Sequence, residues 1–345
     1  MTALLTIPRQ PPPLARLAWR AAAAPEPAEW QVLHAIADRL APPLQEAFLA
    51  AVDAFGAAVA LRELQPLLEG RQVARVDRAL PWDAFAAALA AGGARVVGEG
   101  FAAAAAGAAA FLPQAIRLQL RFDVTNPRAV AWIEQHAAAL VREVTAETRA
   151  AVRALVARAF REGIPPAPLA RLLRERVGLT QQGELAVANY QRFLERLAAR
   201  STLANLAPSV QERLLRSGLQ QRQLAKLART GLTPERISHL VDGYRGRLLQ
   251  ERAEAIARTE TITASSQGQL ELWRQAADAQ LLDSKRTRQT WIVTPDSRLC
   301  PTVCRPMAGQ TVAFGASFRT GDGRRVRTSP AHIRCRCGVR LAFSR

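Results

Sequence analysis

The feature that most constrains this 345-residue chain is a helical repeat of apolar side chains, which lasts from residue 29 to about residue 279. Between Leu44 and Leu64, apolar residues recur at steps of three and four, which places them on one face of a helix. Alanine, leucine, arginine and glutamate dominate the repeat, and all lose little side-chain freedom in a helix. Beyond Ser284, short β-like runs between glycines replace it, at residues 291–293, 311–314 and 339–343. We therefore predict a mainly α chain, with long helices forming an elongated helical body and a small C-terminal β-rich module that contains the cysteines.

Prolines and glycines set the expected limits within the first 120 residues. Residues 1–28 contain six prolines and are predicted to form an extended arm. Residues 29–120 are predicted to form an N-terminal helical region, in which 83–91 and 94–110 are separate short helices. The interruptions expected in this region are Pro42–Pro43, Pro66, Pro81 and Gly92–Gly93.

A second helical body is predicted over residues 121–283. Asn126 is a suitable N-cap with Pro127 in the first turn, and Gly163 is a suitable end for the helix that follows. Thr180 and Thr233 are expected to cap two later helices. The second of these is expected to run from Pro234 to about Ala279, either unbroken or interrupted at Gly243 or Gly246.

Residues 284–345 form a strongly basic segment. It holds thirteen arginine and lysine residues against Asp296 and Asp322, so it carries 13 − 2 = +11 of the formal net charge of +18. Such a concentration indicates a polyanionic partner, most often nucleic acid. The alternative is composition alone, because the whole chain has 45 arginines and two lysines. The arginines expected to contact nucleic acid are Arg319, Arg324, Arg325, Arg327, Arg334, Arg336 and Arg340.

All four cysteines lie in this basic segment and are joined there by one histidine. Two close cysteines, a gap of about thirty residues, and then a close His/Cys group is a spacing typical of a zinc knuckle. Four of these five residues are predicted to hold a structural Zn²⁺, since a small basic module has too small a core to be rigid alone. Two disulfides and four reduced thiols are the alternatives. The candidate ligands are Cys300, Cys304, His332, Cys335 and Cys337.

The sequence offers little for catalysis or for membrane insertion. None of the four histidines lies in a metalloprotease-type motif, and phosphate-binding and nucleophile-elbow motifs are missing from the sequence. His34, His136 and His239 are therefore interpreted as ordinary helix residues. Prolines interrupt any apolar N-terminal signal, and the alanine-rich run 101–112 is too short to cross a bilayer. We expect a protein made in the cytoplasm, with no enzymatic activity and no membrane partner.

One set of short motifs resembles a known family. Residues 256–261 read I-A-R-T-E-T, residues 291–304 contain Trp291, Asp296 and the C-P…C pair, and residues 329–337 read S-P-A-H-I-R-C-R-C. This order is similar to that of the phage Mu F-like minor head proteins. The resemblance covers roughly residues 122–343 and is most specific at the C-terminal end. Its motif residues outside the cysteine cluster are Arg258, Thr259, Glu260 and Asp296.

The resemblance implies a minor capsid protein that acts in head morphogenesis of a tailed phage. Members of the family associate with the portal vertex inside the head, in several copies, and some contact double-stranded DNA. The expected partners are therefore the portal protein, other capsid proteins and packaged DNA, and the expected location is the virion after synthesis in the host cytoplasm. The alternatives are a DNA-processing enzyme of the packaging or injection machinery and, less favoured, a free DNA-binding regulator.

Overall fold

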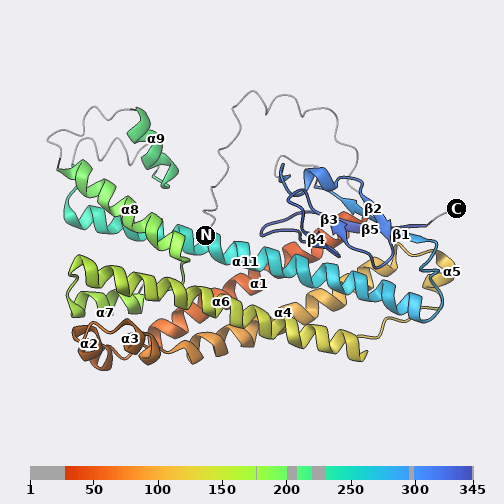
Figure 1. Ribbon diagram of the computed structural model, residues 1–345, viewed down its shortest axis with the longest axis horizontal. Coiled ribbons are helices and arrows are strands. Elements are labelled where there is room, and N and C mark those ends of the chain that lie inside the picture. The colour runs from red at the N-terminus through yellow and green to blue at the C-terminus, as the bar shows by residue number, and fades with distance from the viewer. Residues whose placement is uncertain (1–27, 176, 200–207, 220–230, 295–298, 344–345) are drawn as a thin grey trace. The chain divides into compact units, whose positions relative to one another are not determined.

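The computed structural model describes residues 28–175, 177–199, 208–219, 231–294 and 299–343 (Figure 1). Helices make up 68% of the chain, and a small antiparallel β region lies near the C-terminus, so the predicted mainly α fold class is confirmed. The predicted arm covers residues 1–28, and all of it except residue 28 lies outside the described residues.

The described helices begin and end at the following residues: α1 Ala28–Ala58, α2 Leu61–Glu69, α3 Val73–Ala79, α4 Trp82–Ala109, α5 Gln114–Arg117, α6 Pro127–Glu162, α7 Pro166–Glu175, α8 Gln181–Ala198, α9 Pro208–Arg216, α11 Pro234–Asp278 and the 3₁₀-helix η2 Arg305–Met307. The described strands are β1 Thr287–Ile292, β2 Thr311–Ala313, β3 Phe318–Arg319, β4 Arg325–Val326 and β5 Gly338–Phe343. The predicted β-like runs around Trp291, Val312 and Leu341 all lie in or beside these strands.

The chain divides into two compact units, each built from separate stretches of sequence. Of the described residues, unit 1 contains those within 28–38, 100–124 and 262–343, and unit 2 contains those within 39–99 and 125–261. Contiguous domains with limits at residues 28, 120 and 283 were expected from the sequence. The observed boundaries differ from these because they fall inside helices α1, α4 and α11. Each of these helices contributes residues to both units.

Two predicted interruptions of the N-terminal helices are wrong. Helix α1 continues through Pro42–Pro43, and α2 contains Pro66. The carbonyls that lose their helical donors to Pro42 and Pro43 belong to Asp38 and Arg39, which are exposed and can bind water instead. Burial of apolar side chains on the opposite face, at positions such as Leu40 and Leu44, outweighs the loss of two hydrogen bonds.

The expected break at Gly92–Gly93 is also wrong, because α4 is one helix where two were predicted. Gly92 allows close packing, since a Cβ atom added there would lie 2.5 Å from the Cβ atom of Ala47 on α1. The break expected at Pro81 is confirmed, as α3 ends at Ala79 and α4 begins at Trp82. Glycine in these helices therefore marks contact between helices, whereas Pro81 marks a true helix boundary.

The predicted caps of the later helices are confirmed. The Asn126 side chain accepts a hydrogen bond from the backbone N–H of Arg128, and α6 ends at Gly163 in a left-handed conformation with φ 70°. Thr180 caps α8 through the N–H of Gly183 at 3.1 Å. Helix α11 runs unbroken through both of its candidate glycines. Short-range capping chemistry thus determines these boundaries.

Unit 2 is held by apolar packing and by buried arginines. Phe48, Phe55 and Phe85 are fully buried. The Arg252 guanidinium is buried, donates to the Thr148 hydroxyl at 3.0 Å and to the Gly178 carbonyl at 2.6 Å, and pairs with Glu147. Arg245 donates two hydrogen bonds to the buried carboxylate of Glu184, and Asp77 accepts from Arg149 and Arg153. These pairs link helices within the unit.

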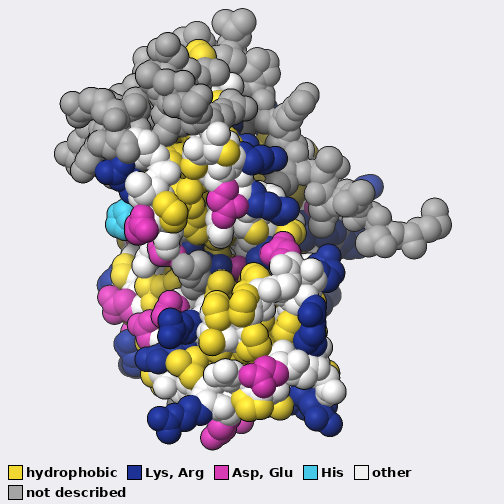
Figure 2. All heavy atoms as spheres, turned by 90° about the vertical axis from the view of Figure 1, so that its left-hand side faces the viewer, with side chains coloured by type: hydrophobic (Ala, Val, Ile, Leu, Met, Phe, Trp, Pro, Cys, Tyr) yellow, Lys and Arg dark blue, Asp and Glu magenta, His cyan; other side chains and the backbone are white. Residues whose placement is uncertain are grey.

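Unit 2 carries both charged and apolar side chains at its surface. On the face drawn in Figure 2, apolar side chains gather in the middle, and basic side chains lie mostly around them with acidic ones among them. Such mixing is usual for solvent-exposed helices. Among the described residues, no single helix is long and apolar enough to cross a membrane; only the bent pair α1 and α2, taken together, satisfies that test.

Unit 1 contains the β module and the helical segments that complete its core. Strand β1 lies at the centre of a three-stranded antiparallel sheet with the order β2-β1-β5, and β3 pairs with β4 (Figure 1). Trp291 and Phe318 are fully buried, and their rings meet edge to face at 5.3 Å. The same core includes Leu270 and Trp273 of α11 and Ala105 and Ala108 of α4. The β module therefore shares its core with helices and is not a separate domain.

Candidate functional site

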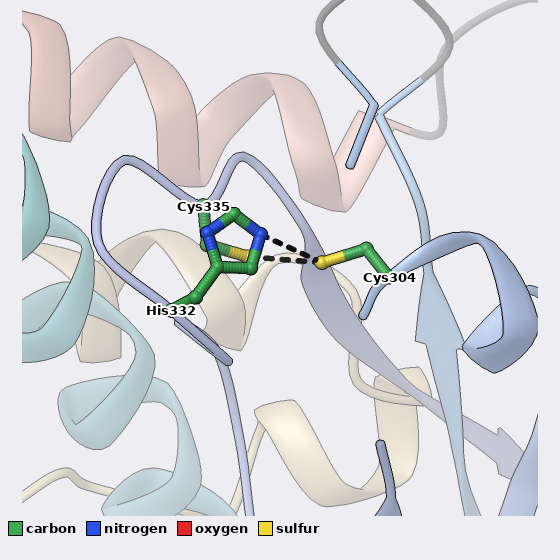
Figure 3. Close-up of side chains that lie close together, drawn as sticks. All are labelled: Cys304, His332 and Cys335. Atoms are coloured by element: carbon green, nitrogen blue, oxygen red, sulfur yellow. Dashed lines mark hydrogen bonds between the residues drawn. The ribbon is translucent and has the colours of Figure 1, made fainter. Parts of the chain in front are cut away.

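Three of the five predicted metal ligands converge on one another in unit 1 (Figure 3). The Cys304 Sγ atom lies 3.1 Å from His332 Nε2 and 3.7 Å from Cys335 Sγ. The possible ligand atoms of all three residues lie within 4.8 Å of one another. Cys304 and Cys335 are buried, and His332 is partly exposed at the edge. The cluster can therefore present two sulfur atoms and one nitrogen atom to a single ion.

Two short segments bring these side chains together. Cys304 immediately precedes the 3₁₀-helix η2, and the loop before it is closed by a hydrogen bond from the Arg305 N–H to the Cys300 carbonyl. His332 and Cys335 lie in the loop between β4 and β5, where the Cys335 N–H donates to the His332 carbonyl at 3.1 Å. Arg334 adopts a left-handed conformation with φ 61°, which turns the chain sharply between the two ligands.

The histidine is oriented as metal-binding histidines usually are. His332 Nδ1 lies 2.7 Å from the Ile333 carbonyl oxygen, which can only accept a hydrogen bond. The proton must therefore be on Nδ1 in the neutral imidazole, which leaves the Nε2 lone pair directed at the cysteines. A hydrogen bond from the non-ligating nitrogen to a carbonyl is the usual outer-shell partner of a metal-bound histidine.

Cys337 adjoins the cluster, and hydrogen bonds connect the three buried thiols. Hydrogen bonds with Cys335 and Cys337 raise the pKa of Cys304, and hydrogen bonds with Cys304 and Cys337 lower the pKa of Cys335. Hydrogen bonding with Cys304 acts to lower the pKa of Cys337, but hydrogen bonding with Cys335 and burial outweigh it and raise the pKa to about 12. Without a cation, mutual repulsion in this buried cluster limits the thiolate charge, whereas a divalent ion would let further thiols ionise.

Cys300 lies outside this group of three. Its sulfur accepts the Val303 N–H at 3.4 Å and contacts the Thr302 hydroxyl at 3.5 Å. Burial acts to raise the pKa of Cys300, but these hydrogen bonds outweigh it and lower the pKa. All four cysteines are free thiols in the structure, and the Cys304–Cys335 sulfur distance is far longer than the roughly 2.05 Å of a disulfide bond.

The cluster fits a tetrahedral Zn²⁺ ion. Two thiolates at the usual Zn–S distance of about 2.3 Å lie about 3.8 Å apart in a tetrahedron, close to the 3.7 Å between Cys304 and Cys335. The matching thiolate–imidazole separation is about 3.6 Å, which is about 0.5 Å longer than the 3.1 Å between Cys304 Sγ and His332 Nε2. Sulfur and imidazole donors are also the ligands that zinc prefers.

The predicted nucleic-acid arginines occupy different surroundings within the β module. Arg319, Arg325, Arg327, Arg334 and Arg340 are exposed, and Arg336 is partly buried. Arg319 and Arg325 are directly paired across β3 and β4, which brings two like charges together. Arg324 is exposed too, but its guanidinium binds the Asp322 carboxylate and the Ala331 carbonyl. Arg324 thus stabilises the β3–β4 turn.

The family-motif residues on α11 form interhelical and local contacts. Glu260 pairs with His136 of α6 at 2.8 Å, and the His136 ring stacks on Trp132 with ring centres 4.6 Å apart. The Thr259 hydroxyl donates to the Ala255 carbonyl, and Arg258 is partly buried. Asp296 lies outside the described residues. Glu260 therefore joins α11 to α6, and Thr259 makes a contact within its own helix.

Sequence reasoning missed two residues that contact the cysteine loop. The Trp30 indole N–H donates to the Arg336 carbonyl at 2.7 Å, and His34 Nε2 lies 3.0 Å from the same oxygen. His34 was interpreted as an ordinary helix residue, because nothing in its local sequence indicates a contact 302 positions away. The i, i+4 spacing of an aromatic residue and a histidine on α1 places both side chains on one face of the helix, but it does not indicate which segment they contact.

Comparisons with protein-family models, with curated proteins and with solved structures find no match for this chain. The likeness to the phage Mu F-like family therefore rests on the motif residues themselves.

Proposed function

We propose that this chain is a minor capsid protein of a tailed phage, which acts in head morphogenesis at the portal vertex inside the head and contacts packaged DNA. The observation that carries the proposal is the convergence of Cys304, His332 and Cys335. These are the residues of the C-terminal motifs on which the family resemblance depends. Cys304 lies about thirty positions before His332 and Cys335 in the sequence, yet the three residues meet in one cluster. Residues that share a structural role are expected to meet in this way.

In this proposal the cluster holds one structural Zn²⁺, with Cys337 as the fourth ligand. Cys337 is buried beside Cys304 and Cys335, whereas the Cys300 sulfur is occupied by local hydrogen bonds. Four protein ligands complete a tetrahedron and leave no coordination position for a water molecule or substrate. The ion would therefore stabilise the module and would not catalyse a reaction.

The exposed arginines support contact with DNA. Arg319 and Arg325 are neighbours across two strands, and like charges in that position are destabilising unless an anion lies between or beside them. Arg327 and Arg340 add two further exposed charges from the same module. Contacts of this kind bind the phosphate backbone, so the binding would be independent of base sequence and sensitive to salt.

The competing functions predict different properties. A DNA-processing enzyme of the packaging or injection machinery needs an open metal position or a group of carboxylates at a cleft, and the described part of the cysteine cluster contributes only sulfur and imidazole ligands. A free DNA-binding regulator would occur as a soluble protein that does not purify with phage heads.

The test of the proposal is to locate the chain in purified particles and to measure their zinc content. Labelled chain should be found at a single vertex in a few copies per head, with about one zinc ion per chain. A uniform distribution over the shell would contradict the portal assignment, and absence from particles would favour the regulator. Nuclease activity of the purified chain that requires added Mg²⁺ would favour the DNA-processing enzyme.

Contact with DNA has a separate test. Binding of the full chain to a duplex of arbitrary sequence should weaken as salt rises, and Arg319→Ala with Arg325→Ala should reduce the slope of log affinity against log salt by about two. Arg216→Ala is the matched control, because this exposed arginine is already paired with Glu212. An unchanged slope in the double variant would remove these arginines from the DNA contact.

A further inference from the structure

The N-terminal part of α1 contacts the cysteine loop at one atom. The Trp30 indole nitrogen and His34 Nε2 lie 2.7 Å and 3.0 Å from the carbonyl oxygen of Arg336. That carbonyl belongs to the residue between Cys335 and Cys337, and all of these residues belong to unit 1. Two side chains on one helix therefore hold the peptide group that connects two of the proposed metal ligands.

The two donors are arranged as a unit on α1. Their spacing of four residues places them one turn apart on the same face of the helix. Their rings lie 4.0 Å apart between centres, and both side chains are buried. Because a carbonyl oxygen can only accept, His34 must carry a proton on Nε2, and packing against the tilted Trp30 ring fixes the direction in which that proton points.

The loop that receives these hydrogen bonds requires support from outside. Arg334 has a left-handed backbone conformation that is rare for residues other than glycine. The Arg336 carbonyl lies two residues further along, just before β5 begins at Gly338. A Cβ atom added at Gly338 would lie 3.5 Å from Trp30 Cδ1, so α1 also packs against the start of that strand.

We infer that Trp30 and His34 are positioning residues of the metal centre, which orient the Cys335–Cys337 segment by fixing the Arg336 carbonyl. This inference rests on the metal centre of the proposed function. Through Trp30 and His34, the first ten residues of α1 contribute to metal binding, although neither side chain touches the ion. Outer-shell hydrogen bonds of this kind commonly change metal affinity by tenfold or more.

The test is a titration of the full chain with Co²⁺, which replaces Zn²⁺ and gives an absorption band from each thiolate–cobalt bond. The double variant Trp30→Phe with His34→Leu keeps two apolar side chains but removes both donors. We expect it to bind Co²⁺ about tenfold more weakly than the wild type, with a shifted thiolate band. His34→Gln keeps an N–H donor and should restore part of the affinity relative to His34→Leu.

Two controls separate positioning from general loss of stability. Trp82→Phe removes an indole hydrogen bond of the same kind, 2.9 Å to the Asp77 carbonyl, in unit 2 and should leave Co²⁺ affinity unchanged. If the double variant does not fold, Trp30→Phe alone provides the comparison, because phenylalanine keeps a ring against His34 without the N–H.

The outcomes also separate this inference from the metal centre itself. Wild-type affinity and an unchanged thiolate band in the variants that remove the donors would overturn the inference and leave the metal centre standing. Equal weakening by Trp82→Phe would likewise overturn it, since the effect would then be one of stability. The lack of any thiolate–cobalt band in the wild type would contradict the metal centre and the inference together.

Discussion

Unit 2 and the β module of unit 1 have different sources of stability. Unit 2 buries large side chains such as Phe48, Phe55 and Phe85 between long helices, and charged networks around Arg252 and Asp77 connect those helices. The β module has strands of two to six residues and gathers its cysteines at one point. Unit 2 gains stability from the apolar area buried between long helices, whereas the β module gains it from a few specific contacts.

This difference indicates where each region is vulnerable. Helices with an apolar face tolerate many substitutions, since each residue contributes a small part of the total. If the Cys/His cluster of the short-stranded module holds the proposed ion, removal of one ligand should cost much more, because metal binding then contributes directly to folding.

The largest effect is expected from loss of a cluster thiol. Cys304→Ser should abolish zinc binding and unfold the β module, at a cost of several kcal/mol, because the remaining donors no longer complete a tetrahedron. Zinc content and thermal unfolding of the purified chain measure this. Cys300→Ser is the matched control and should keep the zinc, and loss of zinc in both variants alike would contradict the assignment of Cys337 as fourth ligand.

A smaller effect is expected from Arg252 in unit 2. Arg252→Ala leaves the Gly178 carbonyl without its charged donor and removes packing against Phe48, so it should lower the free energy of unfolding by about 3 kcal/mol. Arg216→Ala removes an exposed pair and should cost less than about 0.5 kcal/mol. Urea denaturation measures the loss of unfolding free energy in both variants. Equal losses would show that the buried network around Arg252 adds nothing to stability.

Asp77 should make unit 2 less stable as the pH falls into the acid range. Burial acts to raise its pKa, but hydrogen bonds from Arg149 and Arg153 outweigh burial and hold the pKa below the ordinary value of 3.8. Its contribution is therefore fully present above about pH 4 and is lost as pH falls through the lowered pKa.

Asp77→Asn tests this pH dependence. The variant should be less stable by about 2 kcal/mol near neutral pH, and the gap from the wild type should narrow in acid. Denaturation curves between about pH 6 and pH 2 measure this, with Glu212→Gln as an exposed control. A gap that stays constant down to the lowest pH would show that the Asp77 charge does not stabilise the fold.

The smallest effects should come from glycines in helices. A Cβ atom at Gly243 meets nothing within 4 Å, so Gly243→Ala should stabilise α11 by about 0.5–1 kcal/mol. Gly92→Ala places its methyl group against Ala47 and should instead destabilise the protein by about 1–3 kcal/mol. Melting temperatures that shift in opposite directions are expected, and a loss of stability at both positions would mean that Gly243 also has a packing role.

Local chemistry explains what could be predicted from the sequence. Asn126, Gly163 and Thr180 act within their own helix ends, so their roles follow from neighbouring residues. The cysteine spacing likewise predicted a cluster of four among the five residues Cys300, Cys304, His332, Cys335 and Cys337, and three of them, Cys304, His332 and Cys335, do meet. The continuity of α1 through Pro42–Pro43 could not be predicted, because burial of the opposite face outweighs the local cost of proline.

Contacts over long sequence distances explain what could not be predicted. The joining of α1 to the cysteine loop through Trp30 and His34 depends on which helices share a core, and no local pattern contains that information. The same holds for the β module, which the sequence suggested was separate but which is packed around Trp273 of α11 and Ala108 of α4.

Hydrogen exchange with and without a zinc chelator tests the central claim most directly, namely that the β module depends on a metal ion and the helices of unit 2 do not. After chelation, amides in β1 and β5 and around Cys335 should lose their protection, while those of α6 and of residues 234–261 should exchange as before. Unchanged protection in the β module after its zinc has been removed, or the lack of any zinc to remove, would contradict the account.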